Sequence, residues 1–106
     1  MLPVRVVDET GNVKLAELAG GRMPATEGFG GADIVDGDDR RLLVGWVGGA
    51  CDQSAEVRVT AEGGAWTVTV TTDMAPGSCD AIGIGRAVIL DVAVAVDPGS
   101  VAVVSG

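Results

Sequence analysis

Apolar and polar residues alternate strictly between residues 57 and 71. The apolar positions are Val57, Val59 and Ala61, then Trp66, Val68 and Val70. Because side chains along a strand point alternately to its two faces, a period of two predicts two half-buried strands. Gly63-Gly64 lies between them and supplies the positive φ angles of a two-residue turn. The pattern therefore predicts a β-hairpin from Val57 to Thr71.

A two-residue turn at Gly63-Gly64 also fixes which residues face each other across the hairpin. The predicted inward pairs are Ala61 with Trp66, Val59 with Val68, and Val57 with Val70, all apolar. The outward pairs are polar: Thr60 with Thr67 and Arg58 with Thr69. A shift of one residue would move every side chain of one strand to the wrong face, so pattern and turn support each other. We expect an ordinary solvated outer face; an ice-like or carbohydrate-binding threonine array is the alternative.

Further strands are predicted on both sides of this hairpin. Pro3–Val7 is a short strand, and Val13–Leu18 is interpreted as a strand rather than as one helical turn. Arg40–Gly48 is apolar on both faces, which is typical of a covered central strand. The last strand runs from Arg86 through an alternation that ends at Val96. With Pro98-Gly99 as a turn, Val96 would pair with Val101 and Val94 with Val103, which predicts a second hairpin.

Residues 20–39 are the least regular part of the chain. Six glycines and Pro24 interrupt them, and the apolar anchors are Met23, Phe29 and Ile34-Val35. Such a segment is either an interaction surface or a long crossover between strands whose anchors enter the core. Its acidic residues are Asp33, Asp36, Asp38 and Asp39. We interpret them as a solvated turn, with calcium binding as the alternative, although the spacing of an EF-hand is absent.

Composition fits one small β domain over residues 1–106. Hydrophobic residues make up 47% of the 106 residues, with no Tyr, one Phe and two Trp, so the core must consist mainly of Val, Leu, Ile and Ala. Seventeen glycines favour strands joined by tight turns. We expect a small antiparallel β-sandwich of about seven strands, Ig-like in architecture. A small open β-barrel is the alternative.

Charge and hydropathy limit the partners. A net charge of −8 argues against nucleic acid, whose phosphates require clustered Lys and Arg. No run of apolar residues is long enough to predict a transmembrane segment, and the N-terminus lacks the pattern of a signal peptide. The expected partner is an unknown protein or small ligand, and the oligomeric state stays open.

The two cysteines, Cys51 and Cys79, frame the hairpin. Two cysteines in a small acidic domain form a structural disulfide more often than a metal site, which needs about four ligands. The hairpin register continued outward sets Cys51 opposite about Pro76, three residues short of Cys79, and Pro76-Gly77 can take up the difference. We predict a Cys51–Cys79 disulfide; the alternative is a pair of buried thiols. An oxidised pair would indicate an oxidising compartment.

No catalytic constellation is recognisable. The sequence has no His, so no Ser-His or Cys-His nucleophile pair exists. Asp52 and Asp80 each follow a cysteine, and a disulfide would bring them together; they could be hydrolytic carboxylates, turn formers or partners of Arg86. We expect no enzyme, no cofactor and no metal site. A carboxylate-based hydrolase is the least favoured hypothesis.

The segment around the cysteines resembles a class of small uncharacterised exported or lipid-anchored proteins of actinobacteria. The residues that carry the resemblance are Gly48, Gly49, Cys51, Asp52, Cys79, Ala81, Gly83, Arg86 and Val88. The resemblance covers about half of the chain and implies a cell-envelope setting and a disulfide, with no established activity. This chain differs from the class because it has no lipobox cysteine and no signal.

These observations lead to three functional expectations. The first is a non-catalytic exported domain that binds a protein or ligand in the cell envelope through residues 20–39 and their neighbours. The second is a small secreted enzyme inhibitor or ligand carrier, with Asp73–Cys79 as the exposed loop and Met74 at its tip. The third is the hydrolase that would use Asp52 and Asp80.

Overall fold

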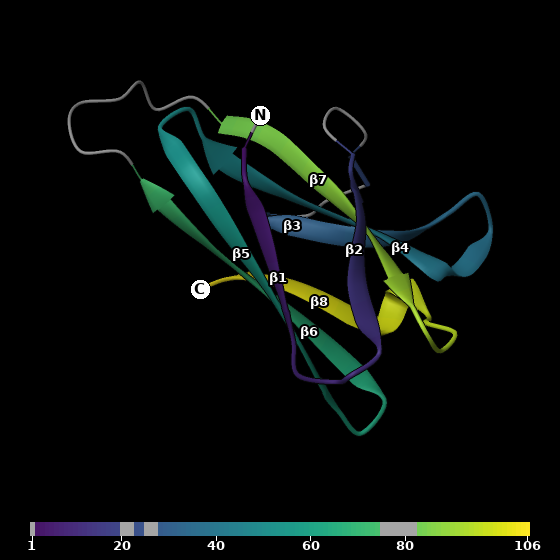
Figure 1. The fold of residues 1–106 in the computed structure, drawn as a ribbon. Coiled ribbons are helices and arrows are strands. Elements are labelled where there is room, and N and C mark those ends of the chain that lie inside the picture. The colour runs from purple at the N-terminus through teal and green to yellow at the C-terminus, as the bar shows by residue number, and fades with distance from the viewer. Residues whose placement is uncertain (1, 20–22, 25–27, 75–82) are drawn as a thin grey trace.

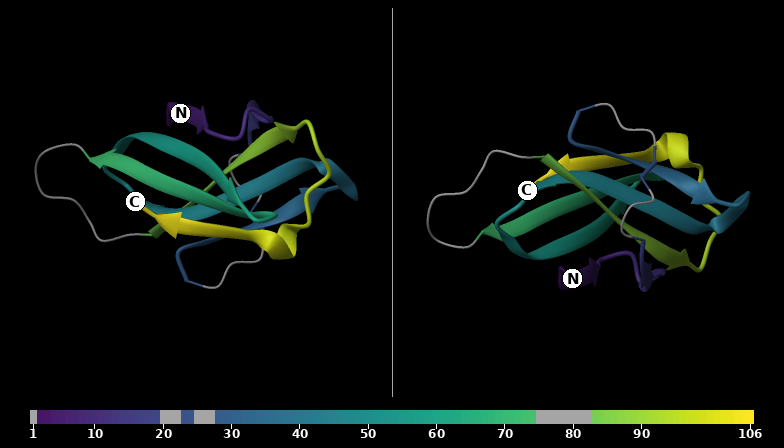
Figure 2. Two further views of the ribbon diagram at one scale, coloured as in Figure 1. Left: turned by 90° about the horizontal axis from the view of Figure 1, so that it is seen from below. Right: turned by 90° about the horizontal axis from the view of Figure 1, so that it is seen from above.

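The computed structural model describes residues 2–19, 23–24, 28–74 and 83–106, and there it is a β-sandwich of eight strands. Two four-stranded sheets lie one over the other and do not close into a barrel (Figures 1 and 2). The strands are β1 (Val4–Asp8), β2 (Val13–Leu18), β3 (Gly30–Val35), β4 (Asp38–Gly49), β5 (Asp52–Glu62), β6 (Ala65–Met74), β7 (Gly83–Val92) and β8 (Val101–Ser105). The predicted small β-sandwich is confirmed, with one strand more than expected.

The two sheets differ in the direction of their strands. The first sheet has the order β1-β5-β6-β8, with β5 and β6 antiparallel at its centre. Both of its edge strands run parallel to their neighbours, β1 to β5 and β8 to β6. The second sheet has the order β2-β7-β4-β3 and is antiparallel throughout. The sandwich is therefore mainly, but not wholly, antiparallel.

The central hairpin has the predicted register. Val57 faces Val70, Val59 faces Val68, Ala61 faces Trp66, and the outward pairs also match. Gly63 and Gly64 have φ angles of 58° and 84°, as the turn requires. A bulge between Asp52 and Ser54 then shifts the register, so that Asp52 faces Met74.

The main core lies between the sheets. Its largest fully buried side chain is Trp46 of β4, and valines of β5 and β6 meet it from the opposite sheet. β4 is buried on its other face as well, where Leu43 packs with Ile89 in a second, smaller core. β4 lies between β7 and β3, so the predicted covered central strand is confirmed.

Met23 and Pro24, which lie between β2 and β3 in the sequence, pack on the outer face of the second sheet. β2 and β3 are the two edges of that sheet. Between them in the sequence, Met23 belongs to the second core and lies with Pro24 over Gly45. The crossover interpretation of residues 20–39 is thus confirmed for Met23. The expected irregularity is wrong from residue 30 onward, because these residues form β3, a two-residue turn at Asp36-Gly37 and the start of β4.

The predicted second hairpin is wrong. β7 ends at Val92, Pro98–Ser100 is a 3₁₀ turn, and β8 joins the first sheet beside β6. The N–H of Val96 donates to the carbonyl of Asp39, and the Asp97 carboxylate accepts from the N–H of Gly99. These bonds hold the segment between β7 and β8, where the chain passes from the second sheet to the first. A period of two fixes which side chains face the core but not which strand lies alongside.

The turn from β1 to β2 also passes between the sheets, and Asp8 organises it. One oxygen of its carboxylate accepts from the N–H and hydroxyl of Thr10, and the other accepts from the N–H of Val13 at 2.8 Å. Burial acts to raise the pKa of Asp8, but the bonds from Thr10, Val13 and the Asn12 backbone together hold that pKa below its ordinary value.

Asp8→Asn tests this turn through the pH dependence of stability. Because the folded state lowers the pKa of Asp8, its stabilising effect is full above the unfolded pKa and is lost as pH falls through the folded pKa. We expect Asp8→Asn to lower the free energy of unfolding by about 1 kcal/mol at pH 7 and by less at pH 3. Urea unfolding at both pH values measures this. Glu62→Gln at the exposed β5–β6 turn is the control, and an equal loss at both pH values for Asp8→Asn contradicts the prediction.

Gly45→Ala tests the contact between the crossover and the second sheet. A Cβ on Gly45 would lie 2.5 Å from the Cδ of Pro24 and 3.0 Å from the sulfur of Met23. We expect a loss of about 1–3 kcal/mol in unfolding free energy. Gly49→Ala on the same strand is the matched control, because its Cβ would make an ordinary 3.5 Å contact with Asp52; it should stay within about 1 kcal/mol of the parent. Equal denaturation midpoints for the two variants would disprove the close contact.

Candidate functional site

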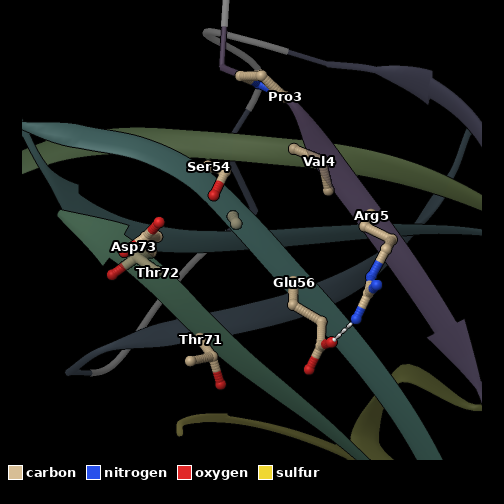
Figure 3. A pocket seen from close by; sticks show the side chains of 9 residues that line it. Pro3, Val4, Arg5, Ser54, Glu56, Thr71, Thr72 and Asp73 are labelled. Atoms are coloured by element: carbon tan, nitrogen blue, oxygen red, sulfur yellow. Dashed lines mark hydrogen bonds and ion pairs between the residues drawn. The ribbon is translucent and has the colours of Figure 1, made fainter. Parts of the chain in front are cut away.

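The outer face of the first sheet carries a shallow groove at the end near the N-terminus (Figure 3). Its volume is about 570 Å³. We call it the outer groove; it is lined by Pro3, Val4, Arg5, Ser54, Ala55, Glu56, Thr71, Thr72 and Asp73. The hollow arises because small outward side chains, Ser54 and Thr71, stand beside longer ones on the neighbouring strands. No aromatic residue lines it.

The charges on this face are arranged in a row. Arg5 of β1 reaches across to the carboxylate of Glu56 on β5, as Figure 3 shows. Arg58 lies next along β5, 3.2 Å from Glu9 and 3.5 Å from Glu56. The hydrogen bond from Arg5, assisted by the positive charge of both arginines, lowers the pKa of Glu56. Glu56 is therefore a hydrogen-bond acceptor at neutral pH and a poor proton donor, which suits binding better than acid–base chemistry.

A second hollow lies between the two sheets, where the edge strands β1 and β2 leave an opening. Its volume is about 190 Å³. We call it the inner cavity; it is lined by Leu2, Val4, Leu18, Trp46, Gly85, Arg86 and Ala87. Arg86 of β7 faces Trp46 of β4 in the second sheet's register. Arg86 thus lies at an inward position of β7. The next inward positions of this strand hold the apolar residues Val88 and Leu90.

Asp52 and Arg86 approach each other over Gly48. A Cβ on Gly48 would lie 2.6 Å from the Oδ2 of Asp52 and 3.4 Å from the Nε of Arg86. They form no ion pair: Asp52 accepts from the N–H of Gly49 at 2.8 Å, while Arg86 donates to the carbonyl of Gly49 at 3.4 Å. Asp52 is therefore a turn former, and the expected Asp52–Arg86 bridge is absent. Asp80, the other expected partner of Arg86, lies outside the described residues.

Two further predictions from the sequence involve residues that the structure describes only in part. Cys51 lies in the short turn between β4 and β5 and is half-buried. Its expected partner Cys79 lies outside the described residues, so the disulfide stays a prediction. Met74 ends β6 and is 62% exposed; the remaining residues of the predicted inhibitory loop, 75–79, also lie outside the described residues.

The acidic cluster forms a hairpin turn between β3 and β4. Asp36 and Gly37 have φ angles of 52° and 75°, which is the geometry of a two-residue hairpin turn. The carboxylate of Asp38 accepts from the N–H of Arg40 at 2.9 Å. Within the part of the chain that the structure describes, no group of three or more His, Cys, Asp or Glu side chains could hold a metal ion. The calcium alternative for Asp36, Asp38 and Asp39 gains no support from this geometry.

Comparison with known proteins found no relatives. No protein-family model matches the chain, and neither a curated protein nor a solved structure does. No helix among the described residues is long and apolar enough to cross a membrane. The function must therefore be argued from the structure itself.

Neither the outer groove nor the inner cavity was predicted from the sequence. The outer groove depends on the parallel pairing of β1 with β5, which places Arg5 beside Glu56. Nothing local in the sequence indicates that pairing. The sequence does contain an indication of the inner cavity. Arg86 shares its alternation with Val88, Leu90 and Val92, so a charged side chain lies in a row of inward-facing residues.

Asp52→Ala tests the turn at the end of β4. The variant leaves the N–H of Gly49 without its acceptor, so we expect a loss of about 1 kcal/mol in unfolding free energy. Asp73→Ala is the control, because the exposed Asp73 makes no hydrogen bond to another described residue. Chemical denaturation monitored by fluorescence measures both. Asp52→Ala as stable as Asp73→Ala would rule out the turn-forming role.

Proposed function

We propose that this protein is a non-catalytic, exported β-sandwich domain that binds a protein of the cell envelope through the outer groove. One observation carries the proposal: Met23 and Pro24 pack on the outer face of the second sheet, whereas the described residues leave a hollow on the outer face of the first sheet. This supports a binding surface outside residues 20–39, where the sequence indicated it, because Met23 from that segment packs against the second core.

The chemistry of the outer groove favours a polypeptide partner. Its polar lining offers hydroxyls at Ser54, Thr71 and Thr72, and charges at Glu56 and Asp73. Sugar rings usually stack on an aromatic side chain, and none is among the described residues that line the groove. The net charge of −8 steers cationic partners toward the domain, so an extended segment with Lys or Arg is the best match.

Two observations support a role without catalysis and an envelope setting. The whole sequence lacks His, and the described carboxylate central to the groove, Glu56, is paired with Arg5. The cysteines at positions 51 and 79 suit an oxidising compartment, as does the resemblance to exported actinobacterial proteins. Both points are part of the proposal.

Thr71→Arg tests the outer groove. Thr71 is exposed on β6 within the groove, and an arginine there would fill the hollow and repel a basic segment. The experiment captures envelope and secreted proteins on the immobilised domain, identifies a partner by mass spectrometry and measures its affinity after purification. We expect Thr71→Arg to weaken binding at least about tenfold.

Val47→Arg is the matched control for that variant. It adds the same charge at a residue that is 41% exposed on β4 of the second sheet. The proposal requires parent-like affinity for Val47→Arg, and a loss of binding on reduction would additionally support a role for the cysteines. A partner that binds Thr71→Arg as tightly as the parent contradicts the assignment of the groove.

The inhibitor alternative rests on Met74. Met74 is 62% exposed at the end of β6, and its flexible apolar side chain would fit a hydrophobic specificity pocket. If inhibition of a secreted hydrolase is found, Met74→Ala should abolish it while Thr71→Arg leaves it unchanged.

A further inference from the structure

Two buried donors for which no described residue is the acceptor belong to residues that line the inner cavity. They are the Nε1 of Trp46 and the Nε of Arg86. Trp46 is 0% exposed, and a buried indole N–H normally finds a hydrogen-bond partner. Leaving such a group unpaired costs about 1–3 kcal/mol, so each case calls for an explanation. Here both belong to residues that face each other across two strands and line one cavity.

Arg86 also forms no ion pair with a described residue. Arg5, Arg41 and Arg58 each lie within 4 Å of a carboxylate. Arg86 has no such neighbour among the described residues, and its one hydrogen bond, to the carbonyl of Gly49, is long at 3.4 Å. Asp52 lies nearby but does not line the cavity, and its Oδ2 is taken by the N–H of Gly49. A partly buried guanidinium in this state favours an anionic acceptor.

The remaining walls of the inner cavity are apolar. Leu2 lies just before β1, Val4 lies in β1, and Leu18 ends β2. All three pack against the main core. The volume of about 190 Å³ equals roughly six water molecules at liquid density. The lining of the cavity thus combines Arg86 and the ring of Trp46 with a short apolar wall.

We propose that the inner cavity binds a small carboxylate with a short apolar tail, of the size of 3-methylbutanoate. The carboxylate pairs with the guanidinium of Arg86, beside the ring of Trp46. The tail contacts Leu2, Val4 and Leu18, from which it displaces water. This site shares only Val4 with the outer groove, and it goes beyond the proposed function.

The two tryptophans allow a direct test. In ¹⁵N-labelled protein, Trp46 and Trp66 each give one indole N–H signal, and Trp66→Phe assigns them. Titration with 3-methylbutanoate should shift the Trp46 signal saturably, with a Kd on the order of 1 mM, and leave the Trp66 signal in place. The neutral analogue 3-methylbutanamide has the same shape and should bind at least about tenfold more weakly, because it lacks the charge.

Variants of Arg86 locate the site. Arg86→Gln should weaken binding of the carboxylate at least about tenfold and remove its preference over the amide. Arg86→Lys keeps the charge but loses the Nε donor, and it should bind the carboxylate with intermediate affinity. If Arg86→Gln does not fold, Arg86→Lys is the variant that tests the role of Arg86. Arg58→Gln, on the outer face, should bind like the parent.

Three results would overturn the proposal. They are a Trp46 signal that does not shift up to about 20 mM carboxylate, equal affinity for acid and amide, and unchanged affinity in both Arg86 variants. The first of these would mean that no carboxylate binds beside Trp46. Thr71→Arg does not touch the cavity and should bind the carboxylate normally, so failure here is separable from failure of the outer groove.

Discussion

The second sheet must be covered on both of its faces, and this requirement shapes the molecule. β4 and β7 carry large apolar side chains on either side: Trp46 and Leu90 point into the main core, while Leu43 and Ile89 point the other way. One face is covered by the first sheet. Met23 and Pro24 of the β2–β3 connection lie on the other, and they can approach only because Gly45 presents no side chain to them. The outward side chains at the centre of the first sheet are mainly polar, such as Glu56, Arg58 and Thr69, so its outer face has no such demand.

Much of the fold could be predicted because it is encoded locally. The alternation from Val57 to Thr71 and the Gly-Gly turn fix a register that the structure reproduces residue by residue. The covered central strand likewise follows from its composition. What failed was the choice of neighbour: Val101 and Val103 fit equally well beside Val96 and Val94 or beside β6, since both arrangements place valine on the core side. Pairing between distant strands depends on the whole packed structure, which no window of sequence contains.

The two hollows could be predicted less well, for the same reason. Arg5 and Glu56 are 51 residues apart in the sequence and meet only through the parallel β1–β5 pair. Arg86 is different, because its place in an inward apolar row is visible in the sequence alone. A charged residue that breaks such a row is a usable sign of a cavity or an internal polar contact. The acidic cluster at Asp36–Asp39 shows the opposite case: a conspicuous group of side chains whose local geometry is that of a turn.

The parallel edge strands have a kinetic consequence. The β5–β6 hairpin joins neighbours through a two-residue turn and can form within microseconds. Each flanking strand must instead close a long loop, 51 residues for β1 and about 35 for β8, before it gains any pairing. The first sheet should therefore grow outward from its centre, with its two edges added last. During that interval both sides of the hairpin offer unpaired backbone to any other strand nearby, so association between nascent chains would compete with folding at this sheet.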